Sequence, residues 1–179
     1  MIDRTVLIPV VVMRKPKIVI FDLDNTLWPY TADTEFEKPF SNNTDGEVID
    51  AEGAIMELLP DVVKILESLR ADNVLIAVAS KTWSKDQYMT LLELFNIREF
   101  FIQFEMFCGH KHIHVGNIVK AQDLAFEDVL FFDDQAKTVQ SFNDGVYSDV
   151  TAIHCPAGIS WQVFEEGLAE FNRSNNDFD

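Results

Sequence analysis

Cysteine, basic residues and long apolar runs are scarce in this chain, and each scarcity excludes a class of protein. Two cysteines, Cys108 and Cys155, are too few for a disulfide framework and indicate a reducing compartment, which we take to be the cytoplasm. Lysine and arginine total 14 against 30 acidic residues, a formal net charge of −16, so a surface for nucleic acid or anionic membrane is not expected. No apolar stretch is long enough to span a bilayer, and the short apolar segment 6–13 lacks the cationic start and cleavage site of a signal peptide.

Apolar residues are abundant, at 47%, and occur in short runs between amphipathic segments. This pattern predicts strands at 17–21, 74–79, 100–104, 129–132 and 150–155. It predicts helices at 60–71, 84–95, 114–124 and 136–143, and a final helix that Ser160 caps and that runs to about 171. Alternating strands and helices predict an α/β fold, a Rossmann-like parallel sheet with helices on both faces.

The length of 179 residues predicts one domain, which we place at residues 15–172. Residues 1–14 are an N-terminal extension without an assigned role, and residues 173–179 are a loose acidic tail. The long irregular connection 31–58 follows the first strand and contains a predicted hairpin at 45–50, so we expect a flap there. We expect a monomer or a weak dimer.

Two carboxylates, Asp22 and Asp24, follow the first predicted strand directly. Ligands of open α/β sheets bind just past the carboxyl ends of the strands, where two acids are poorly placed for stability and well placed for chemistry. They can share a divalent cation, or one can attack an electrophile while the other moves a proton.

Two further strands end in polar residues, Ser80 in one case and the pair Asp133 and Asp134 in the other. A hydroxyl at the end of the strand can bind a phosphoryl oxygen. Adjacent carboxylates repel each other unless a cation or a proton compensates them, and Mg²⁺ prefers a few carboxylates together with water and phosphate oxygens. A magnesium site is therefore predicted beside Asp22.

The strings that carry these residues resemble the haloacid dehalogenase (HAD) superfamily of phosphatases and phosphotransferases. Asp-x-Asp-x-Thr at 22–26 is similar to the first motif of that superfamily, and residues 79–82 and 131–134 are similar to later ones. The longer string Phe-Asp-Leu-Asp-Asn-Thr-Leu-Trp-Pro-Tyr at 21–30, followed by 33–34 and 39–40, resembles the magnesium-dependent phosphatase-1 family. The resemblance extends from about residue 15 to 171.

This resemblance implies a HAD-like fold with a flap and a minimal cap, and a magnesium-dependent phosphatase that hydrolyses phosphate monoesters through an aspartyl-phosphate. It makes Asp22 the nucleophile and Asp24 the general acid and base. The metal site consists of Asp22, the backbone carbonyl of Asp24, and Asp134 with Asp133, and which of the last two binds directly stays open. Substrates associated with the family are phosphotyrosine proteins and sugar or glycated-protein phosphates.

The remaining site residues are predicted as substrate contacts. Ser80 binds the phosphoryl group, and Lys111 aligns with the family's neutralising lysine, with Lys120 as the alternative. Thr26 belongs to the first motif. Trp28 either walls the pocket or belongs to the core.

Competing interpretations remain for some motifs. His110, His112 and His114 alternate and would share one face of a strand, but no further ligand stands at zinc-site spacing beside them. A receiver-type signalling domain fits poorly, because no strand-ending aspartate stands between Ser80 and Asp133. A phosphotransferase of the same superfamily and a non-catalytic phosphate- or protein-binding relative remain the alternatives.

Overall fold

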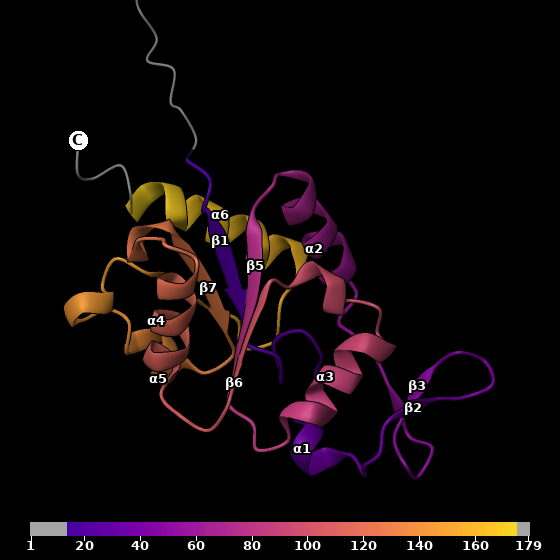
Figure 1. The fold of residues 1–179 in the computed structure, drawn as a ribbon. Helices are drawn as coiled ribbons and strands as arrows, with labels where there is room; N and C mark the ends of the chain where they lie inside the picture. Colours follow the sequence, from indigo (N-terminus) through magenta and orange to yellow (C-terminus); the bar gives the residue numbers. More distant parts are fainter. Residues whose placement is uncertain (1–13, 175–179) are drawn as a thin grey trace, which may run out of the picture.

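The computed structural model describes residues 14–174, which fold around a five-stranded parallel sheet (Figure 1). The strand order is β6-β5-β1-β7-β8, and all four pairings are parallel. This arrangement confirms the predicted Rossmann-like sheet. The strands are β1 (Ile18–Phe21), β5 (Leu75–Ser80), β6 (Gln103–Met106), β7 (Val129–Asp133) and β8 (Thr151–His154).

Helices cover both faces of the sheet, as predicted. Alternate residues of a strand point to opposite faces, so Val19 and Phe21 of β1 join one apolar core while Ile18 and Ile20 join the other. The first core includes α2, α3 and α6, and the second includes α4 with the residues that follow α5. The helices are α2 (Val62–Ala71), α3 (Lys85–Leu94), α4 (Lys111–Ala121), α5 (Ala136–Gln140) and α6 (Trp161–Ser174), with short 3-10 helices η1 (Arg98–Phe100), η2 (Phe126–Asp128) and η3 (Gly145–Tyr147).

The predicted flap contains a short helix and a small antiparallel sheet, which lie on the side of α3 in Figure 1. Asp50 holds one bend of this sheet, because its carboxylate accepts hydrogen bonds from the backbone N–H groups of Glu37, Glu52 and Ala54. The elements are α1 (Ala32–Glu35), β2 (Ser41–Asn42), β3 (Val48–Ile49) and β4 (Ile55–Met56).

Several predicted boundaries are wrong, among them the end of the helix expected at 136–143, which is α5 and stops at Gln140. The strand expected at 100–104 is β6, which begins at Gln103 because residues 98–100 form η1. The helix expected at 114–124 begins earlier, at Lys111. Helix α6 runs to Ser174, into the predicted tail, and residues 175–179 lie outside the described part of the chain.

The predicted extension, residues 1–14, also lies outside the described residues except for Arg14. This residue pairs with Asp128 at 3.0 Å, as does Lys17. Asp128 is buried, and its carboxylate also accepts a hydrogen bond from the backbone N–H of Ala125. Burial alone raises the pKa of Asp128, but these donors outweigh it and lower the pKa. Among residues 14–174, no helix has both the length and the apolar character needed to cross a membrane.

The register of the central strands determines where the site forms. Phe21 of β1 is level with Val78 of β5 and with Phe132 of β7. The residues that follow these three positions therefore emerge together at the carboxyl edge of the sheet.

Candidate active site

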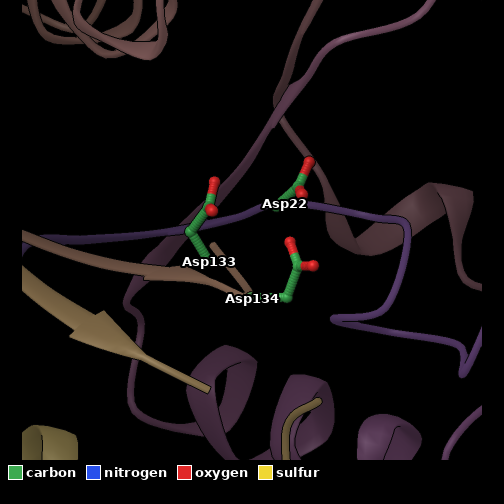
Figure 2. Close-up of side chains that lie close together, drawn as sticks. All are labelled: Asp22, Asp133 and Asp134. Carbon is green, nitrogen blue, oxygen red and sulfur yellow. The ribbon is translucent and has the colours of Figure 1, made fainter. Parts of the chain in front are cut away.

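Three aspartates meet at the carboxyl edge of the sheet. Asp22 follows β1, Asp133 is the last residue of β7, and Asp134 comes next. One carboxylate oxygen from each lies within 4.8 Å of the others (Figure 2). Within residues 14–174 this is the one group of three or more acidic, histidine or cysteine side chains spaced to hold a metal ion.

Lys111 places a buried cation in this cluster. Its Nζ lies 2.6 Å from Oδ1 of Asp22 and 3.0 Å from Oδ2 of Asp133, and it donates a hydrogen bond to the backbone carbonyl of Ala79 at 2.6 Å. Burial disfavours the charged ammonium, but the two carboxylates outweigh this effect and raise the pKa of Lys111. Lys120, the alternative from the sequence, is exposed near the other end of α4.

The short segment 107–110 connects β6 to Lys111, the first residue of α4. His114, buried on the same helix, stacks on the ring of Phe107 at a centroid distance of 3.9 Å. Its ring nitrogens lie 3.0 Å from the carbonyl oxygen of His110 and 2.9 Å from that of Phe107. The alternating histidines therefore do not lie on a strand, and His114 fixes the turn before Lys111.

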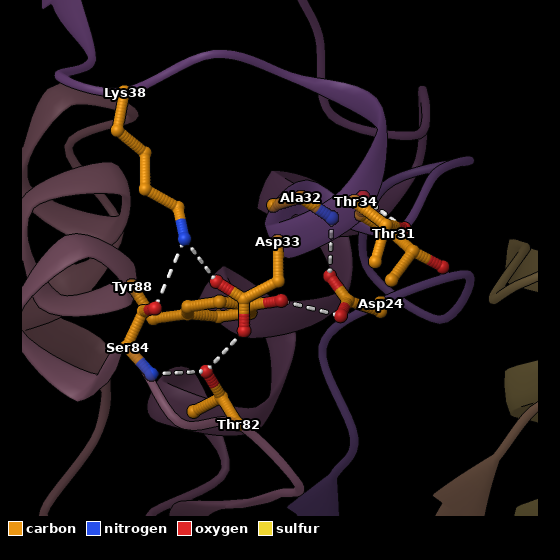
Figure 3. Close-up of polar contacts among 9 residues, drawn as sticks. All are labelled: Asp24, Thr31, Ala32, Asp33, Thr34, Lys38, Thr82, Ser84 and Tyr88. Carbon is orange, nitrogen blue, oxygen red and sulfur yellow. Dashed lines mark hydrogen bonds and ion pairs between the residues drawn. The ribbon is translucent and has the colours of Figure 1, made fainter.

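Asp24 lies outside the carboxylate cluster and inside a separate network of donors (Figure 3). Its Oδ1 accepts hydrogen bonds from Nε1 of Trp28 at 2.8 Å and the backbone N–H of Ala32 at 3.1 Å, while Oδ2 accepts one from the Tyr88 hydroxyl at 2.5 Å. Burial raises the pKa of Asp24, and these hydrogen bonds oppose the rise. The predicted metal contact through the Asp24 backbone carbonyl stays a prediction.

The three donors to Asp24 are not equivalent. An indole N–H and a backbone N–H can only donate, whereas a tyrosine hydroxyl can donate or accept. The network can therefore satisfy Asp24 both as a carboxylate and as a carboxylic acid, with Tyr88 reversing its role.

A second network ties the flap to the loop after β5. Asp33 of α1 lies 2.6 Å from Nζ of Lys38 and accepts a hydrogen bond from the Thr82 hydroxyl at 2.6 Å, while Lys38 donates to the Ser84 hydroxyl at 2.9 Å (Figure 3). Burial opposes ionisation of Asp33, but Lys38, Thr82 and Ser84 lower the pKa of this carboxyl. The network therefore joins α1, whose Ala32 donates to Asp24, to the loop that follows Ser80.

Five of the predicted residues line a small cavity of about 130 Å³. Asp22, Asp24, Ser80, Lys111 and Asp134 all contribute to its wall. Ser80 is 1% exposed and ends β5, next to β1 in the sheet. The structure thus brings together motifs that lie far apart in the sequence.

The predicted substrate contacts of Thr26 and Trp28 stay predictions. Both residues are fully buried and neither lines the cavity. Trp28 lies among aromatic rings of the core, with ring centroids about 6 Å from those of Tyr88 and Phe95, and it donates a hydrogen bond to Asp24.

The loop that carries the first motif is supported by the segment after β8. Gly158 has a φ of +77°, and a Cβ there would lie 2.2 Å from Leu59 Cδ1 and 3.1 Å from the carbonyl oxygen of Asn25. The next residue, Ile159, donates its backbone N–H to the carbonyl of Thr26 at 2.9 Å. A glycine suits this position, because a Cβ would overlap the Leu59 side chain and press on the backbone that follows Asp24, at a φ that side chains rarely adopt.

The acidic cluster needs a further positive charge. Burial raises the pKa of Asp133 despite Lys111, and burial together with the charges of Asp22 and Asp133 raises the pKa of Asp134 to about 6. The buried Oδ1 of Asp134 accepts no hydrogen bond from any described residue, whereas Oδ2 of Asp133 has the Lys111 ammonium 3.0 Å away. Carboxylate oxygens in this arrangement fit a Mg²⁺ ion.

Sequence reasoning missed Tyr88 and the contact between Asp33 and Thr82. Tyr88 lies on the apolar stripe of the helix predicted at 84–95, where a tyrosine is indistinguishable from a core residue. Asp33 and Thr82 both belong to strings that resemble the family, but the sequence alone does not show that they meet.

Comparisons with known proteins agree with this geometry. A family model described as Acid Phosphatase matches residues 14–174. A human protein named Magnesium-dependent phosphatase 1 is 34% identical over 161 residues, which cover 90% of each chain. A HAD-like hydrolase superfamily protein of Schizosaccharomyces pombe is 33% identical over 133 residues, 68% of this chain and 77% of that protein.

Solved structures share the fold at low sequence identity. The N-terminal phosphatase-domain part of a Bacteroides fragilis protein, crystallised with Mg, superimposes with a TM-score of 0.61 at 17% identity, covering 88% of this chain and 40% of that one. A HAD-superfamily hydrolase of Ehrlichia chaffeensis gives a TM-score of 0.61 at 14% identity, covering 92% and 100%.

Proposed function

Because this chain belongs to the acid phosphatase family and, within the HAD superfamily, to the magnesium-dependent phosphatases, we propose that it hydrolyses phosphate monoesters through an aspartyl-phosphate on Asp22. The observation that carries the proposal is the grouping of Asp22, Lys111, Asp133 and Asp134 at one edge of the sheet. The family and the acidic cluster together make Mg²⁺ its cofactor.

Each residue then has a role. A carboxylate oxygen of Asp22 attacks phosphorus, and the bond from phosphorus to the leaving oxygen breaks. Asp24 gives that oxygen a proton and then takes one from the water that attacks the aspartyl-phosphate, which releases phosphate and restores Asp22. Ser80 binds a phosphoryl oxygen, and Lys111 holds Asp22 in place while neutralising charge.

Asp22, Asp134 and, directly or through a hydrogen bond, Asp133 hold the metal ion. When bound, Mg²⁺ neutralises charge and orients the phosphoryl oxygens. The buried Oδ1 of Asp134 supports this assignment, because it has no hydrogen-bond donor among the described residues and a cation would satisfy it.

For substrates, we favour exposed phosphates such as phosphotyrosine in proteins and phosphates of sugars or glycated proteins. The small cavity, of about 130 Å³, supports this choice, since it has room for a phosphate group and leaves the rest of the substrate to be placed beyond it. The free thiols of Cys108 and Cys155 accord with a cytoplasmic setting.

Hydrolysis of p-nitrophenyl phosphate with and without Mg²⁺ tests the function. Wild type should turn over only with Mg²⁺, and Asp22→Asn should lose activity by at least about a thousandfold. Asp149→Asn is the matched control, because Asp149 is exposed and remote from the cavity lining, and it should keep full activity. Inactive, folded wild type across a panel of phosphate esters would favour a binding protein.

Two further measurements resolve the chemistry. Mass spectrometry after acid quench should find one phosphate on Asp22, with more of it in Asp24→Asn, whose base for the second step is missing. Equal release of phenol and inorganic phosphate in the presence of an added alcohol supports hydrolysis. Phosphate recovered on the alcohol would identify a phosphotransferase.

A further inference from the structure

A second cavity, of about 480 Å³, adjoins the small one and has a basic lining. None of its eight lining residues is acidic, although 30 of the 179 residues in the chain are. Lys81, Lys111 and Gln135 line both cavities. A molecule whose phosphate lies over Asp22 can therefore extend into the basic cavity.

Two lysines of the basic cavity have no acidic partner. Lys81 follows β5, Lys137 lies on α5, and both are exposed. Across residues 14–174, neither forms an ion pair with a carboxylate. Lys111 differs, since its charge is already matched by Asp22 and Asp133. The positive charge of Lys81 and Lys137 is thus available to a ligand.

A histidine forms a fixed part of the wall. Nε2 of His112 lies 2.8 Å from the carbonyl oxygen of Ser141, and its ring stacks on Tyr147 with centroids 4.6 Å apart. With Nε2 engaged, Nδ1 is left for other partners. This part of the cavity wall is therefore held in place, polar and without negative charge.

We propose that this basic cavity binds a second anionic group, a carboxylate or a phosphate, that the leaving group of the substrate carries. The proposal rests on the proposed function, because it requires the first phosphate to sit over Asp22. A chain with a net charge of −16 repels polyanions at long range, so selection of such a substrate depends on the local charges of Lys81 and Lys137.

A pair of aryl phosphates tests the proposal. One is phenyl phosphate with a carboxymethyl group at the meta position, and the other is its methyl ester, so they differ by one charge. Their Kd values are measured by calorimetry with Mg²⁺ at one fixed ionic strength, on Asp22→Asn, which keeps the ligands intact. The acid should bind about fivefold more tightly than the ester, as expected for one partly exposed ion pair.

Adding Lys137→Gln, and separately Lys81→Gln, to Asp22→Asn should reduce the ratio of the two Kd values to about twofold or less. Adding Lys120→Gln instead is the matched control, since this exposed lysine lines neither cavity and the ratio should stay the same. The ester's Kd in each variant reports separately on the phosphate site.

Equal Kd values for acid and ester would overturn the subsite, whether or not wild type hydrolyses either compound. A preference for the acid that all three lysine variants retain would overturn it too. If wild type hydrolyses neither these compounds nor any ester of the panel, yet the preference depends on Lys81 and Lys137, the proposed function is wrong and the anion site stands.

Discussion

Replacing Lys111 with methionine tests the claim that this residue holds the acidic cluster together. Methionine has a similar length and an apolar side chain, so the change removes the charge while filling most of the space. In wild type, the ammonium lies 2.6 Å from Asp22 and 3.0 Å from Asp133, with 3% of its side chain exposed. Without it, the carboxylates face one another with no cation from the protein.

The expected loss follows from these distances. At an effective dielectric constant of about 20, Coulomb's law gives each of the two pairs about 6 kcal/mol of attraction. Burying the ammonium costs several kcal/mol, which offsets much of that gain. Removing one member of a buried pair typically costs about 3–5 kcal/mol, because the other charge is left uncompensated, and we expect a loss in this range in the metal-free protein.

Urea denaturation in EDTA, at about pH 8, measures this loss. Lys120→Met is the matched reference, as it makes the same change at an exposed position of α4, and its free energy of unfolding should stay within about 0.5 kcal/mol of wild type. Excess Mg²⁺ should stabilise Lys111→Met more than wild type, because the ion supplies the missing positive charge. A loss below about 1 kcal/mol in EDTA would refute the reasoning.

Three other substitutions probe separate parts of the structure. Tyr88→Phe removes a hydrogen-bond donor to Asp24. We expect kcat/KM to fall about tenfold for alkyl phosphates, because their leaving oxygen needs a proton from Asp24. The loss should be much smaller for p-nitrophenyl phosphate. Gly158→Ala places a Cβ against its neighbours at a positive φ, and we expect the free energy of unfolding in urea to fall by about 2–3 kcal/mol. Gly46→Ala is the control, because its φ is also positive but no atom lies within 4 Å of the added Cβ, and its loss should be about 1 kcal/mol. The pKa of Asp128 is lowered in the folded state, so this carboxylate stabilises the fold above its unfolded pKa of about 3.9. That stabilisation is lost as the pH falls through the folded pKa. The Tm of Asp128→Asn should therefore fall less steeply than that of wild type below about pH 4.

Each of these predictions has a result that contradicts it. An equal loss for alkyl and aryl phosphates in Tyr88→Phe would mean that the hydroxyl does not act through proton transfer by Asp24. Equal costs for the two glycine variants would show that the contacts of Gly158 are unimportant. An unchanged acid limb of the Tm curve in Asp128→Asn would show that its ion pairs do not stabilise the fold.

Much of the fold follows from local pattern in the sequence. Short apolar runs such as β1 and β7 are too short for helices and alternate with amphipathic segments, and this is enough to predict a parallel sheet covered on both faces. Boundaries were less predictable. Helix α4 starts at Lys111, where His114 stacks on Phe107, a contact that no local propensity encodes.

The sequence by itself identified the aspartates at the strand ends as candidate site residues. Aspartates after buried strands are unusual without a function, and the strings around them resemble a known family. Only the tertiary structure decided which side chains meet. The parallel register brings Asp22 beside Asp133 and Asp134, α4 delivers Lys111 to them, and α3 carries the Tyr88 hydroxyl to Asp24. The tertiary structure also shows that Trp28 and Thr26 are buried and that Lys81 and Lys137 line a basic cavity. The physical reason is that burial and charge pairing depend on contacts between residues distant in the chain, and a linear pattern does not contain these distances.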